Sequence, residues 1–172
     1  MKKIAAMFVF GGALAVAAQL SAQGMVHVTL MDAQGKPVGM AMLSSSPKGV
    51  AIALDVKGLS AGEHAIHVHM TPKCEGPAFA TAGGHFNPAN KKHGLKNPDG
   101  PHAGDMPNFT VAADGTAKTT VVAPGVTLGS GNTSVFANGG TALVIHAKAD
   151  DMMTDPAGDA GDRIACGVIS KM

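Results

Sequence analysis

Histidine is the residue type that points to chemistry in this chain. Seven of the eight histidines fall in a few short segments, namely GEHAIHVHM (His64, His67 and His69), GGHFNP (His85), KKHGLKNPDGPHAGD (His93 and His102) and LVIHAKADD (His146). Imidazole is the usual protein ligand of copper and zinc. About seven protein ligands are more than one ion normally takes, so the pattern predicts an extended metal centre.

The ligands divide into two sets by their setting. His67 and His69 are two residues apart in an expected strand, so both side chains lie on one face while Val68 faces the core. His146 lies in another expected strand, and for each of these strand histidines a structural role is the alternative. The second set, which lies in one long loop, consists of His85, His93, His102 and Asp105. Three imidazoles and one carboxylate form a reasonable tetrahedral zinc set, with a solvated polar loop as the alternative.

The elements that must position these ligands are β-strands. Short runs with apolar residues at every second position are bounded by turn residues, and they occupy residues 25–31, 38–43, 50–57, 63–70, 109–112, 117–123, 142–147 and 163–170. About eight such strands predict an all-β antiparallel sandwich or flattened barrel, with a hairpin around Asp114 and Gly115. Residues 71–107 and 149–162 form two long loops, and their histidine and aspartate content favours a functional role. Because the chain has no Trp and no Tyr, the core must be aliphatic and an antibody-type domain is disfavoured.

The N-terminus has the pattern of a secretory signal. Lys2 and Lys3 precede an apolar stretch over residues 4–18, and small residues follow through Ala22. We therefore expect a signal peptide over residues 1–22 and one domain over residues 23–172, with cleavage between Ala17 and Gln23. A membrane anchor is the alternative, although the apolar run is short for a bilayer.

Charge and cysteine content narrow the class further. Removal of the signal leaves 13 − 2 = 11 basic residues against 12 acidic ones, which excludes the basic excess of a nucleic-acid surface. The exported part holds both cysteines, Cys74 and Cys166. Export implies an oxidising compartment, so one intramolecular disulfide is expected, with two free buried thiols as the alternative.

Six segments occur in an order that matches a known family: GEHAIHVH, CEGPAFATAGGHFNP, KKHG, GPHAGDMPN, LVIHAKADD and GDRIACGVI. Over nearly all of the mature chain they resemble the copper/zinc superoxide dismutases of the exported bacterial kind. The resemblance implies a Greek-key sandwich or flattened barrel, and disproportionation of superoxide to dioxygen and hydrogen peroxide. It implies one copper ion and one zinc ion per subunit. It also implies a periplasmic monomer or homodimer that has no membrane attachment after signal removal.

The resemblance assigns roles to individual residues. The copper ligands would be His67, His69, His85 and His146. The zinc ligands would be His85, His93, His102 and Asp105, so that His85 bridges the two ions. Asp150 would link a copper-side histidine to a zinc-side one, and His64 would tie the site to the backbone. Cys74 and Cys166 would anchor the zinc loop to the last strand. Arg163 would meet the anion beside copper, which makes Arg163 and His85 the catalytic residues.

A few residues remain outside these roles. His27 is expected on the surface of the first strand. Met70, Met106, Met152 and Met153 lie near the predicted site; packing is the favoured interpretation, and a soft thioether ligand is the alternative. Two other functions stay open: an exported copper- or zinc-carrying protein without turnover, and a cell-surface domain with incidental histidines. The complete ligand set together with Arg163 favours the enzyme.

Overall fold

Nine β-strands make up nearly all of the regular structure in residues 24–171, the part of the chain that the computed structural model describes. They are β1 (Val26–Asp32), β2 (Pro37–Ser46), β3 (Gly49–Lys57), β4 (Gly62–His64), β5 (Ile66–His69), β6 (Phe109–Val111), β7 (Thr116–Ala123), β8 (Thr141–His146) and β9 (Arg163–Ile169). Two short 3₁₀ turns, η1 (Ala80–Ala82) and η2 (Ala137–Gly139), are the helical elements of this range. The expected signal peptide lies outside the described residues. Neither 3₁₀ turn is long and apolar enough to cross a membrane.

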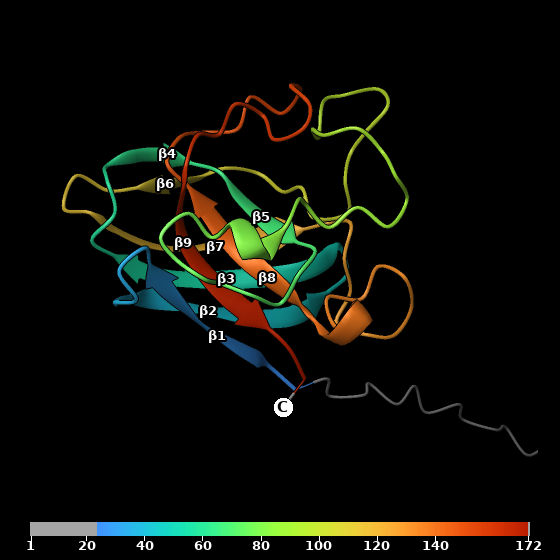
Figure 1. Ribbon diagram of the computed structural model, residues 1–172, viewed down its shortest axis with the longest axis horizontal. Coiled ribbons are helices and arrows are strands. Elements are labelled where there is room, and N and C mark those ends of the chain that lie inside the picture. Colours follow the sequence, from blue (N-terminus) through green and yellow to red (C-terminus); the bar gives the residue numbers. More distant parts are fainter. Residues whose placement is uncertain (1–23, 172) are drawn as a thin grey trace, which may run out of the picture.

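Seven of the strands form one antiparallel sheet in the order β5-β8-β9-β1-β2-β3-β7, and β4 pairs with β6 in a small second sheet. Figure 1 shows the large sheet curling around its inner face. Period-2 alternation sends successive side chains to opposite faces, so one face of each strand turns inward. The all-β antiparallel fold that the sequence predicts is confirmed.

Two details of the prediction need correction. The strand expected over residues 63–70 is interrupted at Ala65, because its N–H donates to the carbonyl of Lys148 (2.8 Å) and its carbonyl accepts from the N–H of His146 (2.9 Å). The described chain therefore has nine strands where eight are expected. The turn at Asp114 and Gly115 does form, but the strands on either side of it join different sheets: β6 pairs with β4, and β7 pairs with β3.

A largely aliphatic core fills the inside of the curled sheet, and Phe86 and Phe109 also belong to it, so the expectation of an aliphatic core holds only in part. Leu30, Leu43, Ile52 and Leu54 from β1, β2 and β3 are fully buried, and the residues between them on these strands are more exposed. Each such side chain contributes about 1.5–3 kcal/mol when it leaves water. The core thus supplies a rigid support on which the loops are placed.

The two long loops lie side by side and are bonded to each other (Figure 1). The N–H of Lys96 donates to the carbonyl of Met152 (3.0 Å). Gly94 has a φ of 109°, and any side chain there would overlap the carbonyl of Met152, so this close approach requires glycine. The disulfide between Cys74 and Cys166 ties the first loop to β9, which confirms the predicted pairing.

Candidate metal centre

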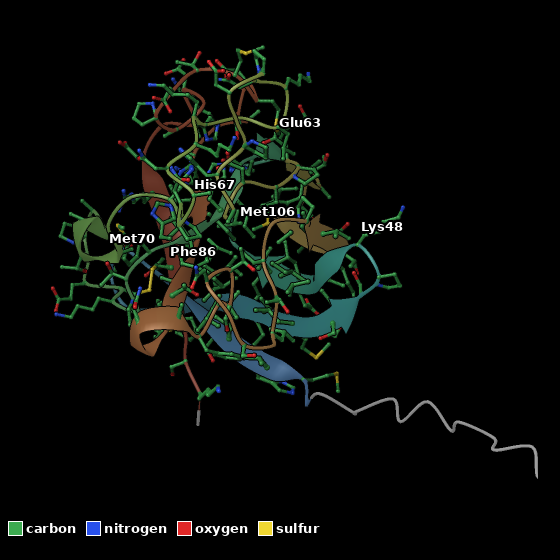
Figure 2. All side chains as sticks on the ribbon, turned by 90° about the vertical axis from the view of Figure 1, so that its right-hand side faces the viewer. Lys48, Glu63, His67, Met70, Phe86 and Met106 are labelled. Atoms are coloured by element: carbon green, nitrogen blue, oxygen red, sulfur yellow. A yellow bond between two sulfur atoms is a disulfide. The ribbon has the colours of Figure 1, made fainter. Side chains whose placement is uncertain are left out.

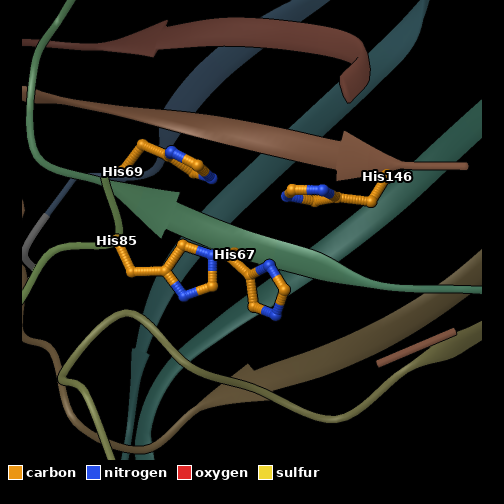
Figure 3. A group of neighbouring side chains, drawn as sticks. All are labelled: His67, His69, His85 and His146. Atoms are coloured by element: carbon orange, nitrogen blue, oxygen red, sulfur yellow. The ribbon is translucent and has the colours of Figure 1, made fainter. Parts of the chain in front are cut away.

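Three segments carry the first group of histidines. β5 carries His67 and His69, β8 ends at His146, and the long loop brings His85 against β5 through an isolated bridge to His69. Val68, between the two β5 histidines, packs in the hydrophobic core, as the alternation predicts. Figure 3 shows the four imidazoles converging from these segments.

Each of these four rings has one nitrogen that is buried and has no hydrogen-bond partner. The atoms are Nδ1 of His67 and Nε2 of His69, His85 and His146. A group of donor atoms from these four residues lies within 4.8 Å of one another. A buried nitrogen without a partner costs about 1–3 kcal/mol, and four such atoms facing one another are an expensive arrangement unless a ligand satisfies them. Imidazole nitrogens gathered in this way fit a copper ion.

The other nitrogen of each ring is held by an oxygen atom, which fixes the ring orientation. The partners are Asp150 Oδ2 for His67 Nε2 (2.9 Å), the Gly83 carbonyl for His69 Nδ1 (2.9 Å), Asp105 Oδ1 for His85 Nδ1 (2.9 Å) and the Gly161 carbonyl for His146 Nδ1 (3.3 Å). With a proton on the oxygen-bonded nitrogen of His67, His69 and His146, the unpartnered nitrogen keeps its lone pair. The chain therefore prepares the donors in the correct tautomer.

A second donor cluster surrounds one oxygen of Asp105. Its Oδ1 lies 2.9 Å from Nδ1 of His85, 3.1 Å from Nδ1 of His93 and 3.3 Å from Nδ1 of His102. Its Oδ2 accepts from the N–H groups of Gly94 (2.8 Å) and His102 (3.0 Å), so the loop backbone orients the carboxylate. Three nitrogens and one oxygen at this spacing are the donor set of a closed zinc site.

The geometry also gathers His67, His85, His93 and Asp105 into one compact group, with His67 in place of His102. Hydrogen-bond distances favour the set with His102. The Nε2 of His67 is already bonded to Asp150, whereas Nδ1 of His102 lies 3.4 Å from Nδ1 of His85 and next to Asp105. All seven predicted ligands are thus brought together, and His85 belongs to both clusters.

Electrostatics separate the two sides of the centre. Burial lowers the pKa of His85 and of His146 to about 4, and it also lowers the pKa of His67 and His69. These rings are therefore neutral at pH 7, with lone pairs available. Burial would likewise lower the pKa of His93, but the carboxylates on both sides raise it to about 9.

The carboxylates respond in the opposite direction. Burial on its own would raise the pKa of Asp105 and of Asp150, but hydrogen bonds from the histidines hold both well below the usual range. Both groups are therefore anionic at neutral pH, and their negative charge lies beside positions that suit two cations.

Asp150 lies between the two clusters, as the resemblance implies. Its Oδ2 is 2.9 Å from His67 Nε2, and its Oδ1 is 3.0 Å from His93 Nε2. Sequence reasoning missed Asn108, whose side-chain amide bonds both the N–H and the carbonyl of Asp150 at 2.9 Å. The only signal for it is its place at the end of GPHAGDMPN. His64 lies with Nδ1 2.7 Å from the carbonyl of His146, which ties β4 to the end of β8.

A cleft of about 520 Å³ opens over the first cluster, and its lining includes His69, His85, His146 and Arg163. The guanidinium of Arg163 donates to the carbonyls of Phe79 (2.8 Å) and Gly83 (2.7 Å), so its charge is fixed in position. A larger cleft of about 670 Å³ also includes Arg163 but none of the histidines, and it lacks the donor set that chemistry needs.

The methionines near the centre have different environments. Met106 is fully buried and Met152 is nearly so, whereas Met70 and Met153 are exposed. Figure 2 shows Met70 beside Phe86, apart from the buried Met106. Packing in the interior explains Met106 and Met152, but it does not explain the exposed Met70 and Met153.

Fold and site together define a class: an antiparallel β-protein with two adjoining histidine-rich donor sets that share one imidazole. The chain matches the family model described as copper/zinc superoxide dismutase (SODC) over residues 37–169, and it belongs to this family. It is an enzyme that disproportionates superoxide to dioxygen and hydrogen peroxide, with copper and zinc as its metals.

Individual relatives agree with this assignment. The chain is 47% identical over 171 residues to "Superoxide dismutase [Cu-Zn] 2" of Aquifex aeolicus, covering 98% of this chain and 99% of the relative. A crystal structure of a SOD-like protein from Bacillus subtilis superposes with a TM-score of 0.81 at 37% identity, covering 85% of this chain and 99% of that one. The Cu/Zn superoxide dismutase from Brucella abortus has a TM-score of 0.72 at 32% identity, covering 86% of this chain and 100% of that one.

Proposed function

We propose that copper is held by Nδ1 of His67 and by Nε2 of His69, His85 and His146. We propose that zinc is held by His85, His93, His102 and Asp105, and that His85 is shared. The observation that carries the copper assignment is the set of four buried, unpartnered nitrogens that face one another. The zinc assignment is supported by the three Nδ1 atoms around one oxygen of Asp105.

When bound, copper supplies a one-electron redox couple, and zinc supplies a fixed positive charge. The overall reaction converts two superoxide ions and two protons into dioxygen and hydrogen peroxide. His85 lines the cleft, contacts Asp105 and belongs to both donor clusters. We assign its Nε2 two alternating tasks, to donate its lone pair to copper and to carry one of the two protons, because no hydrogen bond occupies that nitrogen and its one lone pair serves either task but not both at once.

Arg163 is assigned the orientation of the substrate anion. Two of its five N–H groups are used on the carbonyls of Phe79 and Gly83, which hold the guanidinium at the cleft beside His69 and His146. A fixed cation of this kind attracts superoxide and stabilises developing negative charge without having to move. Asp150 and His64 are assigned positioning roles, since each holds a ligand-bearing segment through hydrogen bonds.

Replacement of Arg163 tests this assignment. Arg163→Ala is expected to lower kcat/KM roughly tenfold or more while both metal contents stay unchanged. Arg163→Lys keeps the charge but cannot bond both carbonyls in the same fork geometry, so it is expected to recover only part of the activity. Unchanged turnover in Arg163→Ala would remove the role. Full metal occupancy without any turnover in the wild-type protein would instead favour the metal-carrying alternative.

We also infer that residues 1–22 are a signal peptide and that the domain over residues 23–172 works in the periplasm. Support comes from the charged and apolar pattern of the N-terminus and from the disulfide, which persists in oxidising compartments. Mass spectrometry of the exported protein is expected to show an N-terminus between Ala17 and Gln23. An intact N-terminus would contradict the inference. Sedimentation of the same sample distinguishes monomer from homodimer.

A further inference from the structure

Methionine dominates the large apolar side chains that this protein exposes. In residues 24–171, six large hydrophobic side chains are exposed, of which five are methionines and the sixth is Val168. No leucine, isoleucine or phenylalanine of that range reaches comparable exposure. Thioether sulfur is a soft metal ligand, so these side chains offer a chemistry that exposed leucine or isoleucine would not.

Two of the five exposed methionines lie on one face of the sheet, and a third directly precedes β1, beside the one histidine that the metal centre does not use. Met25 (61% exposed) precedes the exposed His27 by two residues at the start of β1. On the neighbouring strand β2, Met42 (39% exposed) lies directly opposite His27. Met40 (46% exposed) is two residues from Met42, so the alternation of β2 directs it to the same outer face.

The distances within such a pair of strands suit a shared ligand. Cβ atoms directly opposite each other are about 4.5–5.5 Å apart, and diagonal neighbours are about 7–8 Å apart. Methionine is unbranched with three rotatable bonds, so Sδ atoms of Met40 and Met42 can approach the imidazole of His27. On the other side of β2, the small Ala53 faces Met42, and a hollow of about 340 Å³ lies along both methionines. The side chains therefore have room to change rotamer.

We propose that Met40, Met42 and His27, with Met25 as a further thioether donor, form a surface site for the soft monovalent cation Cu(I). Thioether sulfur selects Cu(I), whereas Zn²⁺ and harder divalent ions prefer nitrogen and oxygen donors. The site uses none of the residues of the histidine centre. Figure 1 shows β1 and β2 at the bottom of the view and the loop before β9 at the top. The two long loops meet β1 at its C-terminal end, around Asp32, whereas His27 lies near its other end. The protein would thus carry reduced copper at a place separate from its redox site.

The test uses the copper- and zinc-loaded protein, so that the histidine centre is already filled. Ag(I), a redox-inert stand-in for Cu(I), is titrated in chloride-free buffer into protein labelled with ¹³C at the methionine methyl groups. The methyl signals of Met40 and Met42 are expected to shift together and to saturate at one added equivalent. A parallel anaerobic titration with Cu(I) against a chromophoric chelator measures the affinity.

The matched variants keep shape and apolarity while removing sulfur. Met40→Leu combined with Met42→Leu is expected to weaken binding roughly tenfold or more, since two soft donors are lost at nearly constant volume. Met153→Leu, which removes an exposed thioether from the second loop, is expected to leave the binding unchanged. Turnover is expected to equal that of the wild type in every variant, so a failure here is distinguishable from a failure of the proposed catalytic assignment.

Three results would overturn the site. One is the absence of a saturable response at the Met40 and Met42 methyl signals. Another is equal affinity in the double leucine variant. The third is a dimer in sedimentation that covers this face and leaves the loaded protein unable to take up Ag(I), which would make the face an interface between copies of the chain.

Discussion

The role of Asp150 in holding the copper-side ring can be tested by Asp150→Asn, which changes one atom and keeps the volume. The carboxylate is buried, and it accepts from His67 at Oδ2 and from both His93 and the N–H of Met152 at Oδ1. An amide has only one acceptor oxygen. The orientation that keeps the two bonds at Oδ1 therefore places the NH₂ group against Nε2 of His67.

An NH₂ group at that place donates to Nε2 and shifts the ring proton of His67 to Nδ1. Nδ1 is the unpartnered nitrogen that faces the other three imidazoles, so its protonation would remove one of the four proposed copper donors. Loss of one hydrogen bond to a charged group costs about 1.5–3 kcal/mol. Replacement of a group that hydrogen-bonds to a metal ligand weakens metal affinity by roughly 10–100-fold. We therefore expect Asp150→Asn to bind copper more weakly by this factor. The affinity for zinc is expected to fall less, because His93 keeps its hydrogen-bond partner at Oδ1.

Competition with a chelator, followed by metal analysis, measures both affinities in one sample. The control is Asp159→Asn, an exposed carboxylate on the same loop at a φ of 52°, which asparagine tolerates. Circular dichroism checks that the fold is intact. A variant that loses zinc but keeps copper, or that keeps both at wild-type affinity, would refute the reasoning about the His67 tautomer.

Two further predictions concern stability. Cys74→Ala combined with Cys166→Ala removes the disulfide, which links residues 92 positions apart. The free energy of unfolding is expected to fall by about 4–5 kcal/mol, and the Tm of the loaded protein measures this loss. An unchanged Tm would contradict the prediction. For the metal-free protein, burial lowers the pKa of His85 and His146 from 6.5 to about 4, so below about pH 6.5 the unfolded chain binds protons that the folded chain does not. The free energy of unfolding is therefore expected to fall by about 2 kcal/mol or more between pH 6.5 and pH 4.5. His93, with its pKa raised to about 9, is already charged in the folded state across this window and adds little to the slope. Urea midpoints at the two pH values measure the change, and a midpoint that rises on acidification would disprove it.

Much of the fold could be predicted from the sequence, because the patterns that indicate β-strands lie within short segments of the chain. Alternation in segments such as β3 has a period of two whatever the strand pairs with, so the inward and outward faces could be predicted residue by residue. The break at Ala65 could not, because it depends on hydrogen bonds to Lys148 and His146, which lie about half the chain away. The pairing of β6 and β7 could not be predicted either. The expected turn joins these two strands, but each of them pairs with a strand from an earlier part of the chain.

The donor types of the metal centre were also accessible, since imidazole and carboxylate groups can be counted and spaced without coordinates. The sequence alone therefore identified the candidate metal ligands, and it showed that two cysteines were available for one disulfide. Only the tertiary structure decided which nitrogen of each ring is free. That choice depends on oxygen partners remote in the chain, such as Asp150 for His67 and the carbonyl of Gly83 for His69. A tautomer is set by what touches the ring, and no pattern along the chain encodes that contact.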